Sequence, residues 1–430
     1  MSFRGKLWVL MISGVVAVYA VVGGLPLVNG LLSASAQQPV NDATAQLKIV
    51  ESVLQHIQND YVDEPNMEKV RLGALRGLAG GLDPYSAYLT PEQVKTFEAN
   101  KTTPRVGIGA EFSQISGYLY VISAIKGSPS EKAGIKNGDV IEYIDGKASR
   151  DISLYDAKQL VDGDAGSTIS LRVLRAGEKA QTIKVVRGGY KVPQAESRVE
   201  NGKIGVIKVF SLEDGQANDI KTQIGNLTKQ GVSKIVLDLR GVAAGKITEG
   251  ATVANLFIKS GEIARVIGKD SKVLTTYTAD PAKAVFDGTL AVLTDLGTAG
   301  AAEVVAAAVL DKKRGEVIGE RSFGAGTEQK LFTITSGGGY LLTIAKWAAP
   351  NGTPFLGDER ATTGVKPSIE VKRPDTPEPL DIESLGEPQE PNPAATPTPT
   401  PKPAPAKVLE DIQLKKALEV LGGNAAKAAA

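Results

Sequence analysis

Apolar residues recur at two different periods along the chain, which separates a helical region from strand-rich ones. Between about Thr44 and Asn100 the apolar side chains return every three or four residues, for example at positions 47, 50, 53, 54 and 57. This spacing places them on one face of a helix. The stretch Gly80–Pro84 breaks the pattern, because glycine and proline disfavour continuing a helix. We therefore expect a small helical region over residues 37–102.

Between about residues 103 and 190 the period shortens to alternation, with glycines between the runs. The alternating runs Tyr118–Ile122, Val140–Ile144 and Thr168–Val173 are typical of strands. The loop Gly127–Asp139 joins the first two through a short helix, and its residue types and spacing resemble the signature of a PDZ domain. We expect a PDZ domain over residues 103–190. A β-rich domain whose glycines serve only turns is the alternative.

A PDZ domain binds a peptide as an added strand and captures the terminal carboxylate of that peptide with backbone N–H groups. By resemblance this role falls to Gly107, Ile108 and Gly109. Glycine suits such a loop because it lets the backbone approach a ligand closely. The resemblance implies that the partners are C-terminal tails of proteins.

From about residue 202 onward, strand and helix patterns alternate. The expected strands are 205–209, 234–239, 290–294 and 317–319, and the expected helices are 216–230, 249–257 and 302–309. Such alternation predicts an α/β sandwich with a largely parallel sheet over residues 191–373. The expected fold class is therefore a multidomain α+β or α/β protein with a helical unit, a PDZ β-domain and an α/β core. In such cores, sites form outside the carboxyl ends of strands.

The N-terminus has the features of an export signal over residues 1–36. Arg4 and Lys6 precede an apolar run from Leu7 to Gly24, and Ala34–Ala36 follows as a small-residue cleavage site. The run is also long enough to span a bilayer, so a retained membrane anchor is the alternative. In either case we expect the remaining chain outside the cytoplasmic membrane, periplasmic or anchored and facing outward.

Proline dominates residues 374–407, which predicts an extended linker. A short amphipathic helix is expected after it, over residues 408–430, ending at Gly422-Gly423. Its apolar face would comprise Val408, Leu409, Ile412, Leu418 and Leu421. Two interpretations stay open: a solvated helix without a partner, or a helix docked on the core or on a partner protein.

Composition limits the chemistry. The chain has no cysteine and a single histidine, His56, within a helical pattern. Thiolate nucleophiles, disulfides and multi-histidine metal sites are excluded, and we expect no metal and no cofactor. Covalent hydrolysis would need a serine or threonine activated by lysine. The formal net charge of +1 gives no electrostatic case for nucleic acid.

The order of helical unit, PDZ domain and α/β core resembles that of the carboxyl-terminal processing peptidases, the S41 family. The resemblance covers roughly residues 44–371. Besides the PDZ signature, it rests on the stretches Leu82–Glu92, Leu237–Arg240, Thr298–Gln329, Leu342–Trp347, Pro350–Gly352 and Gly364–Pro367.

The family resemblance implies a Ser-Lys dyad, and this chain has neither residue at the matching positions. The nucleophile motif, similar to Thr-Ala-Ser-Ala-Ser-Glu, falls on Thr298–Glu303, so Gly300 takes the serine position. The lysine motif, Phe-Gly-Lys-Gly-x-x-Gln, falls on Phe323–Gln329, so Ala325 takes the lysine position. Gln329, which assists the lysine in the family, is retained. No intact catalytic residue is therefore expected.

The oxyanion site also departs from the family pattern. Where the family has Arg-x-Asn-Pro-Gly-Gly, this chain has Arg240–Gly245. The backbone N–H groups of Gly245 and Ala301 remain oxyanion-hole candidates, because such donors belong to the main chain. Loss of the proline alters the turn that would aim them. Glu303 is interpreted as a helix N-terminal acid favoured by the dipole rather than as a catalytic group.

Three functions are considered. The first is an exported pseudopeptidase that binds protein C-terminal tails, as an adaptor, a decoy or a partner of an active homologue, or through self-association. The second is an active serine-type peptidase with a relocated dyad, for which Ser322, Thr298, Thr327 and Lys330 are the residues at hand. The third is a structural envelope protein that assembles through its terminal helices.

Overall fold

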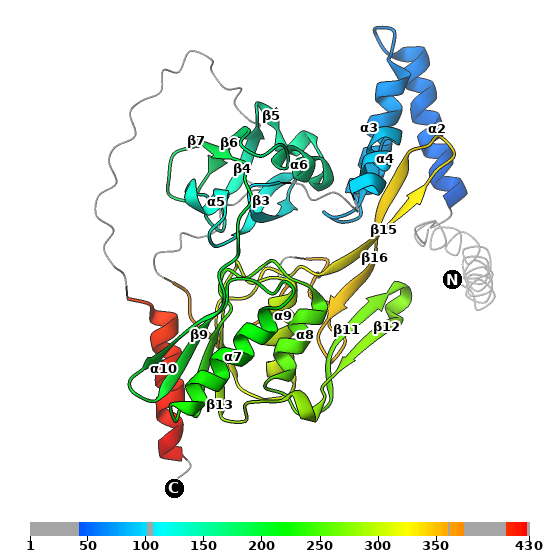
Figure 1. The fold of residues 1–430 in the computed structure, drawn as a ribbon. Coiled ribbons are helices and arrows are strands. Elements are labelled where there is room, and N and C mark those ends of the chain that lie inside the picture. Colours follow the sequence, from blue (N-terminus) through cyan, green and yellow to red (C-terminus); the bar gives the residue numbers. More distant parts are fainter. Residues whose placement is uncertain (1–42, 101–105, 360–361, 374–409, 428–430) are drawn as a thin grey trace, which may run out of the picture. The chain divides into compact units, whose positions relative to one another are not determined.

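The computed structural model describes residues 43–100, 106–359, 362–373 and 410–427 (Figure 1). The chain divides into two compact units, residues 1–73 and 74–430. The predicted export signal or anchor and the predicted linker lie outside the described residues. Of the helices that are described, none is long and apolar enough to cross a membrane.

The first unit contains helix α2 (Ala43–Asp60) and the start of helix α3 (Met67–Gly80). Apolar residues of α2 such as Leu47 and Val53 are more than half exposed. His56 lies on the same exposed helix, where its Nδ1 contacts a carboxylate oxygen of Asp60 at 2.7 Å. The single histidine is thus a surface residue that contacts Asp60, one helical turn further along α2.

The second unit begins with the end of α3, strand β1 (Ala87–Leu89) and helix α4 (Pro91–Asn100). The region that the sequence pattern assigned to helices therefore also contains a strand. All three residues of β1 are buried, and β1 pairs antiparallel with β16 (Gly339–Ala348), far along the chain. This pairing is long-range, so local periodicity could not reveal it.

The next domain is a six-stranded sheet, in which five strands have the order β2-β3-β4-β6-β7 and β5 pairs with β4. Strand β2 lies at one edge. Helix α6 (Leu154–Val161) contacts β2 and packs with the sheet around a common apolar core. The other elements are β2 (Ala110–Ile115), β3 (Tyr118–Ala124), α5 (Pro129–Lys132), β4 (Val140–Ile144), β5 (Lys147–Ala148), η1 (Ser149–Asp151), β6 (Thr168–Leu174) and β7 (Gln181–Val186).

The core domain is built on a six-stranded sheet in the order β17-β14-β13-β10-β9-β8. Every pair in it is parallel except β8 with β9. The predicted α/β core with a largely parallel sheet is therefore confirmed. Its elements are β8 (Glu196–Glu200), β9 (Ile204–Lys208), α7 (Gln216–Lys229), β10 (Lys234–Asp238), α8 (Ile247–Asn255), β13 (Thr289–Thr294), α9 (Ala301–Asp311), β14 (Glu316–Gly319) and β17 (Ile369–Glu370).

A second sheet of the core has the order β1-β16-β11-β12, with β15 on the other edge of β16. The sequence pattern did not identify these strands. They are β11 (Glu262–Gly268), β12 (Val273–Thr278), β15 (Thr327–Thr333) and β16, with the short turns η2 (Lys269–Ser271) and η3 (Pro281–Lys283) nearby. Strand β16 carries Trp347, whose backbone N–H donates to the Gly326 carbonyl at 2.9 Å.

Helix α10 (Ile412–Lys427) covers one face of the six-stranded sheet. Alternate residues of β10 point to opposite faces: Ile235 and Leu237 face α7, α8 and α9, and Val236 faces α10. Of the two interpretations of this helix, the structure has it docked on the core. It continues through Gly422-Gly423, where the sequence predicted an end. Its packed residues are Leu414, Ala417, Leu418, Val420 and Leu421, which include the predicted Leu418 and Leu421; Ile412 is half-buried, and Val408 and Leu409 lie outside the described residues.

Candidate functional site

Gly300 lies directly after the loop that follows β13, at the N-cap of α9. Its backbone angles, φ 56° and ψ −113°, are in a region that residues with a side chain rarely adopt. A Cβ at this position would meet a Trp347 ring carbon at 3.6 Å and the Ala243 carbonyl oxygen at 3.7 Å, which are ordinary contacts. The position thus has room for a small side chain, at the cost of backbone strain.

The buried carboxylate of Glu303 joins the two stretches where the family dyad is expected. Its Oε2 accepts from the Gly300 N–H at 2.8 Å and from the Ala325 N–H at 2.9 Å. Its Oε1 accepts from the Gly324 N–H at 2.7 Å and from the Ser322 hydroxyl. Gly300 and Ala325 are therefore brought together, because their backbone nitrogens bond the same oxygen atom.

Burial dominates the electrostatics of Glu303. Desolvation raises its pKa to about 7, and the four donors oppose this rise. The Gly300 N–H contact agrees with the interpretation of Glu303 as an acid at the start of a helix. The sequence analysis did not predict the hydrogen bonds of Glu303 to residues 322, 324 and 325. A Glu three residues after an N-cap indicates the contact with Gly300, but no local pattern indicates the other three.

Both oxyanion-hole candidates carry an N–H group without an acceptor among the described residues. The Ala301 N–H is the first of α9, and the N–H groups of the next three residues donate to Ala299 and Gly300. The Leu212 N–H donates to the Ala244 carbonyl, and the Leu212 carbonyl accepts from the Lys246 N–H. In this pairing the N–H and the carbonyl of Gly245 point away from Leu212. A Cβ at Gly245 would lie 2.6 Å from the Leu212 carbonyl oxygen, which makes glycine necessary there. The assignment of these two residues stays a prediction.

The hydroxyl groups considered for a relocated dyad are hydrogen-bonded to groups other than an amine. Ser322 is fully buried, donates to Glu303 and accepts from the Val365 N–H at 2.7 Å. The Thr298 hydroxyl is also buried and donates to the Leu239 carbonyl at 3.0 Å. Lys330 lies on an exposed part of β15, with its Nζ 5.3 Å from the centre of the Phe332 ring.

Gln329, the retained residue of the lysine motif, is exposed on β15. Its amide nitrogen donates to the Thr327 hydroxyl at 2.6 Å and lies 3.4 Å from the Thr343 hydroxyl. Thr327 is thereby also engaged. Gln329 thus bonds neighbouring strand residues rather than an amine.

One face of the PDZ sheet packs on Ala325 and on Ala299, the residue before Gly300. Tyr120 of β3 stacks on Phe323, with ring centroids 5.5 Å apart. The Ser123 hydroxyl donates to the Gly241 carbonyl at 2.6 Å. This interface also contains an apolar cluster of Tyr118, Ile122, Val140 and Ala299, with Ile115, Leu174, Ala243 and Ala325 against it. The Ala325 position is therefore apolar and partly covered.

The predicted peptide-binding residues form a loop whose carbonyls are all bonded. The carbonyls of Gly107, Ile108 and Gly109 accept from the N–H groups of residues 188, 130 and 125, respectively. None of the three N–H groups of the loop has an acceptor in the described part of the chain. Gly109 has φ +70°, and a Cβ there would collide with Ser128. The loop can thus offer N–H donors to an anion, as the resemblance implies.

Strand β2 follows this loop in the chain, and helix α6 packs beside β2. Gly107 lies against Asp162, just past the end of α6, and Tyr190 lies against Gly109. Glu111 of β2 is half-buried, and the loss of solvent raises its pKa while the nearby Lys158 of α6 lowers it. Burial raises the pKa of Tyr190 to about 12, and nearby carboxylates add to the rise. Charged groups of both signs thus flank the loop.

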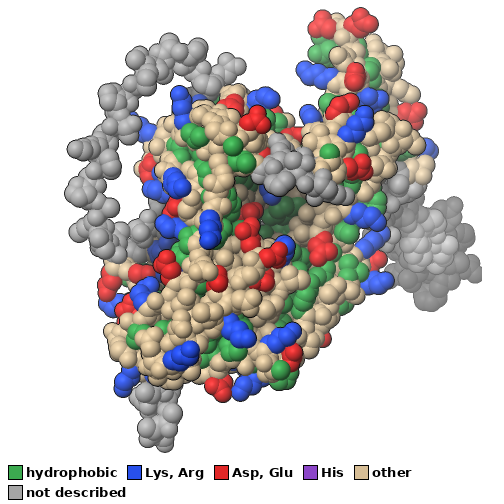
Figure 2. Space-filling model, viewed as in Figure 1, with side chains coloured by type: hydrophobic (Ala, Val, Ile, Leu, Met, Phe, Trp, Pro, Cys, Tyr) green, Lys and Arg blue, Asp and Glu red, His purple; other side chains and the backbone are tan. Residues whose placement is uncertain are grey.

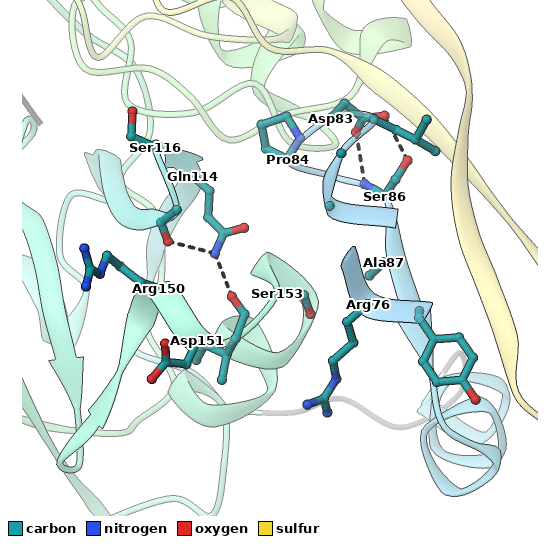
Figure 3. Close-up of a pocket in the computed structure, with 16 residues that line it drawn as sticks. Arg76, Asp83, Pro84, Ser86, Ala87, Gln114, Ser116, Arg150, Asp151 and Ser153 are labelled. Atoms are coloured by element: carbon teal, nitrogen blue, oxygen red, sulfur yellow. Dashed lines mark hydrogen bonds between the residues drawn. The ribbon is translucent and has the colours of Figure 1, made fainter. Parts of the chain in front are cut away.

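The end of β2 borders a cavity of about 500 Å³, shown in Figure 3. The end of β2, the turn η1 and the residues just before α6 form one wall, with Gln114, Arg150 and Ser153. Residues 80–88 and the end of α3 form the other, with Asp83 and Arg76.

On the face seen in Figure 2, acidic and basic side chains are interspersed. Within the described residues, no three acidic or histidine side chains are grouped so as to hold a metal ion.

The chain is similar to two families of domains. A model of peptidase family S41 matches residues 203–371, and a model of the PDZ domain matches residues 120–175. These matches fall on the parallel-sheet core and on the domain that contains β3, β4 and β6.

Two curated proteins and one solved structure match over most of their lengths. The carboxy-terminal processing protease CtpA of Bacillus subtilis (strain 168) is 30% identical over 349 residues, which are 81% of this chain and 74% of that protein. A probable CtpA-like serine protease of Staphylococcus aureus (strain bovine RF122 / ET3-1) is 31% identical over 368 residues, 85% of this chain and 71% of the relative. The structure of a photosystem II D1 C-terminal processing protease matches with a TM-score of 0.61 at 25% identity, over 77% of this chain and 94% of that one.

Proposed function

Because this chain belongs to peptidase family S41, as a relative of the CtpA-type carboxy-terminal processing proteases, we propose that it binds C-terminal protein tails without cleaving them. The observation that carries the proposal is the pair Gly300 and Ala325. Their backbones meet at one Glu303 oxygen, yet neither position bears a hydroxyl or an amine. A serine activated by a lysine is the chemistry that the family uses, and both groups are missing here.

The expected catalytic loss is large. Removing the members of such a unit costs on the order of 10⁴ to 10⁶ in rate, and only binding and oxyanion stabilisation remain. The buried Ser322 and Thr298 are engaged in hydrogen bonds, which argues against their replacing the nucleophile. We infer a pseudopeptidase rather than an enzyme with a relocated dyad.

Tail binding is supported by the loop Gly107–Gly109 and by the edge strand β2. The loop offers N–H groups for a terminal carboxylate, and β2 has a free edge within its sheet for an added strand. We propose that the bound tails belong to exported proteins. The basis is the N-terminal sequence, Arg4 and Lys6 before the apolar run Leu7–Gly24, which would direct this chain out of the cytoplasm.

Cleavage of an unfolded protein with an apolar C-terminus tests the missing dyad. The native chain is compared with a Gly300→Ser, Ala325→Lys variant and with a matched Gly300→Ala, Ala325→Met variant that adds bulk without chemistry. A lysine at 325 would lie in an apolar cluster, and desolvation would lower its pKa as a general base requires. We expect no cleavage by the native chain or the matched variant, and cleavage by the Ser/Lys variant. Cleavage by the purified native chain would contradict the proposal.

Binding is tested separately, with fluorescent tails that carry either a free or an amidated C-terminus. We expect the free carboxylate to bind at least about tenfold more tightly, because charged hydrogen bonds to the loop are lost on amidation. Equal binding would exclude the loop as a carboxylate site. No binding of either tail would favour the structural envelope role.

A further inference from the structure

The proposed tail-binding function fixes the direction in which a tail would run along β2. The carboxylate loop precedes β2, so a tail whose last residue lies at Gly107–Gly109 must run antiparallel to Ala110–Ile115. Its earlier residues then lie toward the end of β2. With a rise of about 3.3 Å per residue on both strands, the residue opposite Gln114 is roughly five before the end of the tail. This is where the cavity of Figure 3 begins.

Arg76 is a polar side chain of this cavity with a buried nitrogen that has no hydrogen-bond partner in the described part of the chain. It extends from α3 toward the cavity (Figure 3), and none of the hydrogen bonds or ion pairs within the described residues involves it. Its Nε is buried without an acceptor. Guanidinium groups in such surroundings are normally paired, because an unsatisfied buried donor destabilises the protein.

Two other polar side chains of the cavity, Asp83 and Gln114, already have hydrogen-bond partners. Asp83 accepts from the N–H groups of Tyr85 and Ser86, from the Ser86 hydroxyl and from the Thr343 hydroxyl. The Gln114 amide nitrogen donates to the carbonyls of Ile152 and Gly117. Asp83 therefore has four donors without Arg76, and a ligand carboxylate is the group that Arg76 still lacks.

Arg150 lines the same cavity in a different setting. Its guanidinium carbon lies 5.2 Å above the centre of the Tyr118 ring, on the opposite wall from Arg76. The cation–π contact already gives this group a partner. Arg150 is thus a matched control: an arginine of the same cavity with a contact of its own.

We propose that Arg76 is a specificity-determining residue that binds an acidic side chain of the tail, about five residues before its C-terminus. This inference rests on the tail-binding function proposed above. A carboxylate in the cavity accepts charge-assisted hydrogen bonds from the guanidinium, and an amide of the same shape accepts weaker ones. The tails that bind most tightly therefore have a free apolar C-terminus and an upstream Asp or Glu.

The test uses the full chain and fluorescent twelve-residue tails with an apolar C-terminus, with Glu, Gln or Lys placed in turn at the fourth to seventh residue from the end. Dissociation constants are measured by anisotropy for the native chain, Arg76→Gln, Arg76→Glu and the control Arg150→Gln. We expect Glu to bind about tenfold more tightly than Gln at one of these positions in the native chain. Arg76→Gln should abolish the difference, Arg76→Glu should favour Lys, and Arg150→Gln should keep the native preference.

Two results would overturn the inference, and they are distinguishable from failure of the proposed function. Tails that bind the native chain with equal affinity whatever residue stands upstream would leave tail binding intact and exclude the Arg76 subsite. A Glu preference that persists in Arg76→Gln would assign it to another residue. Absence of any tail binding would overturn both proposals together. The native-chain series needs no variant, so a misfolded substitution does not affect the first comparison.

Discussion

Glu303 accepts four hydrogen bonds where water is excluded, so its charge state depends on the folded structure. Burial raises its pKa from 4.5 to about 7. Between these values the folded chain holds a proton that the unfolded chain has released. The stability that this group contributes is present in full below pH 4.5 and is lost as pH rises through about 7.

We expect the free energy of unfolding to fall by roughly 3 kcal/mol over this interval through Glu303 alone. The measurement is urea unfolding at several pH values for the native chain and for Glu303→Gln. The variant should be less stable at low pH, because an amide –NH2 accepts no hydrogen bond whereas the hydroxyl oxygen of a protonated carboxyl still can, and its curve should be flatter. Parallel curves for the two proteins would show that Glu303 does not titrate in this range.

The sequence predicted that Glu303 lies at the start of a helix, but it did not predict the contacts of Glu303 with the loop after β14. The motif placed it three residues after Gly300, at the start of a helix, and that contact is present at 2.8 Å. The contacts with Gly324 and Ala325 join segments far apart in the chain. They arise because β14 ends beside β13 in the sheet, so the loops after both strands meet. Periodicity reports local structure and contains no information on such pairings.

Helix α10 shows how packing against a sheet overrides local signals. Gly422-Gly423 predicted an end, since glycine is the poorest helix former after proline. The helix nevertheless continues to Lys427, with Ala417 and Leu421 buried on the strands. Arg240 binds both carboxylate oxygens of Asp411 at 2.8 Å, just before the helix. The pattern predicted the helix and two of its packing residues, Leu418 and Leu421, but it predicted neither the packing of Ala417 nor the length of the helix.

Leu421→Ala tests the contribution of this helix. The side chain is almost completely buried, and its truncation leaves a cavity, so we expect a loss of about 2 to 4 kcal/mol of unfolding free energy. Glu419→Ala, on the exposed side of the same helix, should change stability by less than about 0.5 kcal/mol. Urea unfolding compares the two variants. Equal small effects would mean that α10 is not docked in solution.

In the molecule as a whole, the PDZ sheet covers the position where the family has its lysine. Tyr120 stacks on Phe323, and Ala325 packs beside this pair. The sequence predicted both domains, and their family assignment is confirmed. It did not predict which face of the PDZ sheet meets the core, because Tyr118 and Tyr120 look like ordinary strand residues.

The absence of cysteine allows a direct test of this covering. With Ala325→Cys as the single thiol, labelling by a maleimide should be slow, and adding Tyr120→Ala should accelerate it by about tenfold, because one aromatic stack is lost. Tyr143→Ala is the control, since Tyr143 of the same domain packs with Arg172 instead. Fast labelling without Tyr120→Ala would show that the PDZ domain does not stay on the core.

The docked helix also bears on the order in which the protein is made. All strands of the parallel sheet precede residue 371, and the helix that covers their outer face begins at Ile412. A chain emerging from a ribosome or a translocation channel therefore completes its sheet while Val206, Val236, Leu293 and Ile318 still face water. Until α10 arrives, this face is an apolar surface on a nascent protein, open to chaperones and to aggregation.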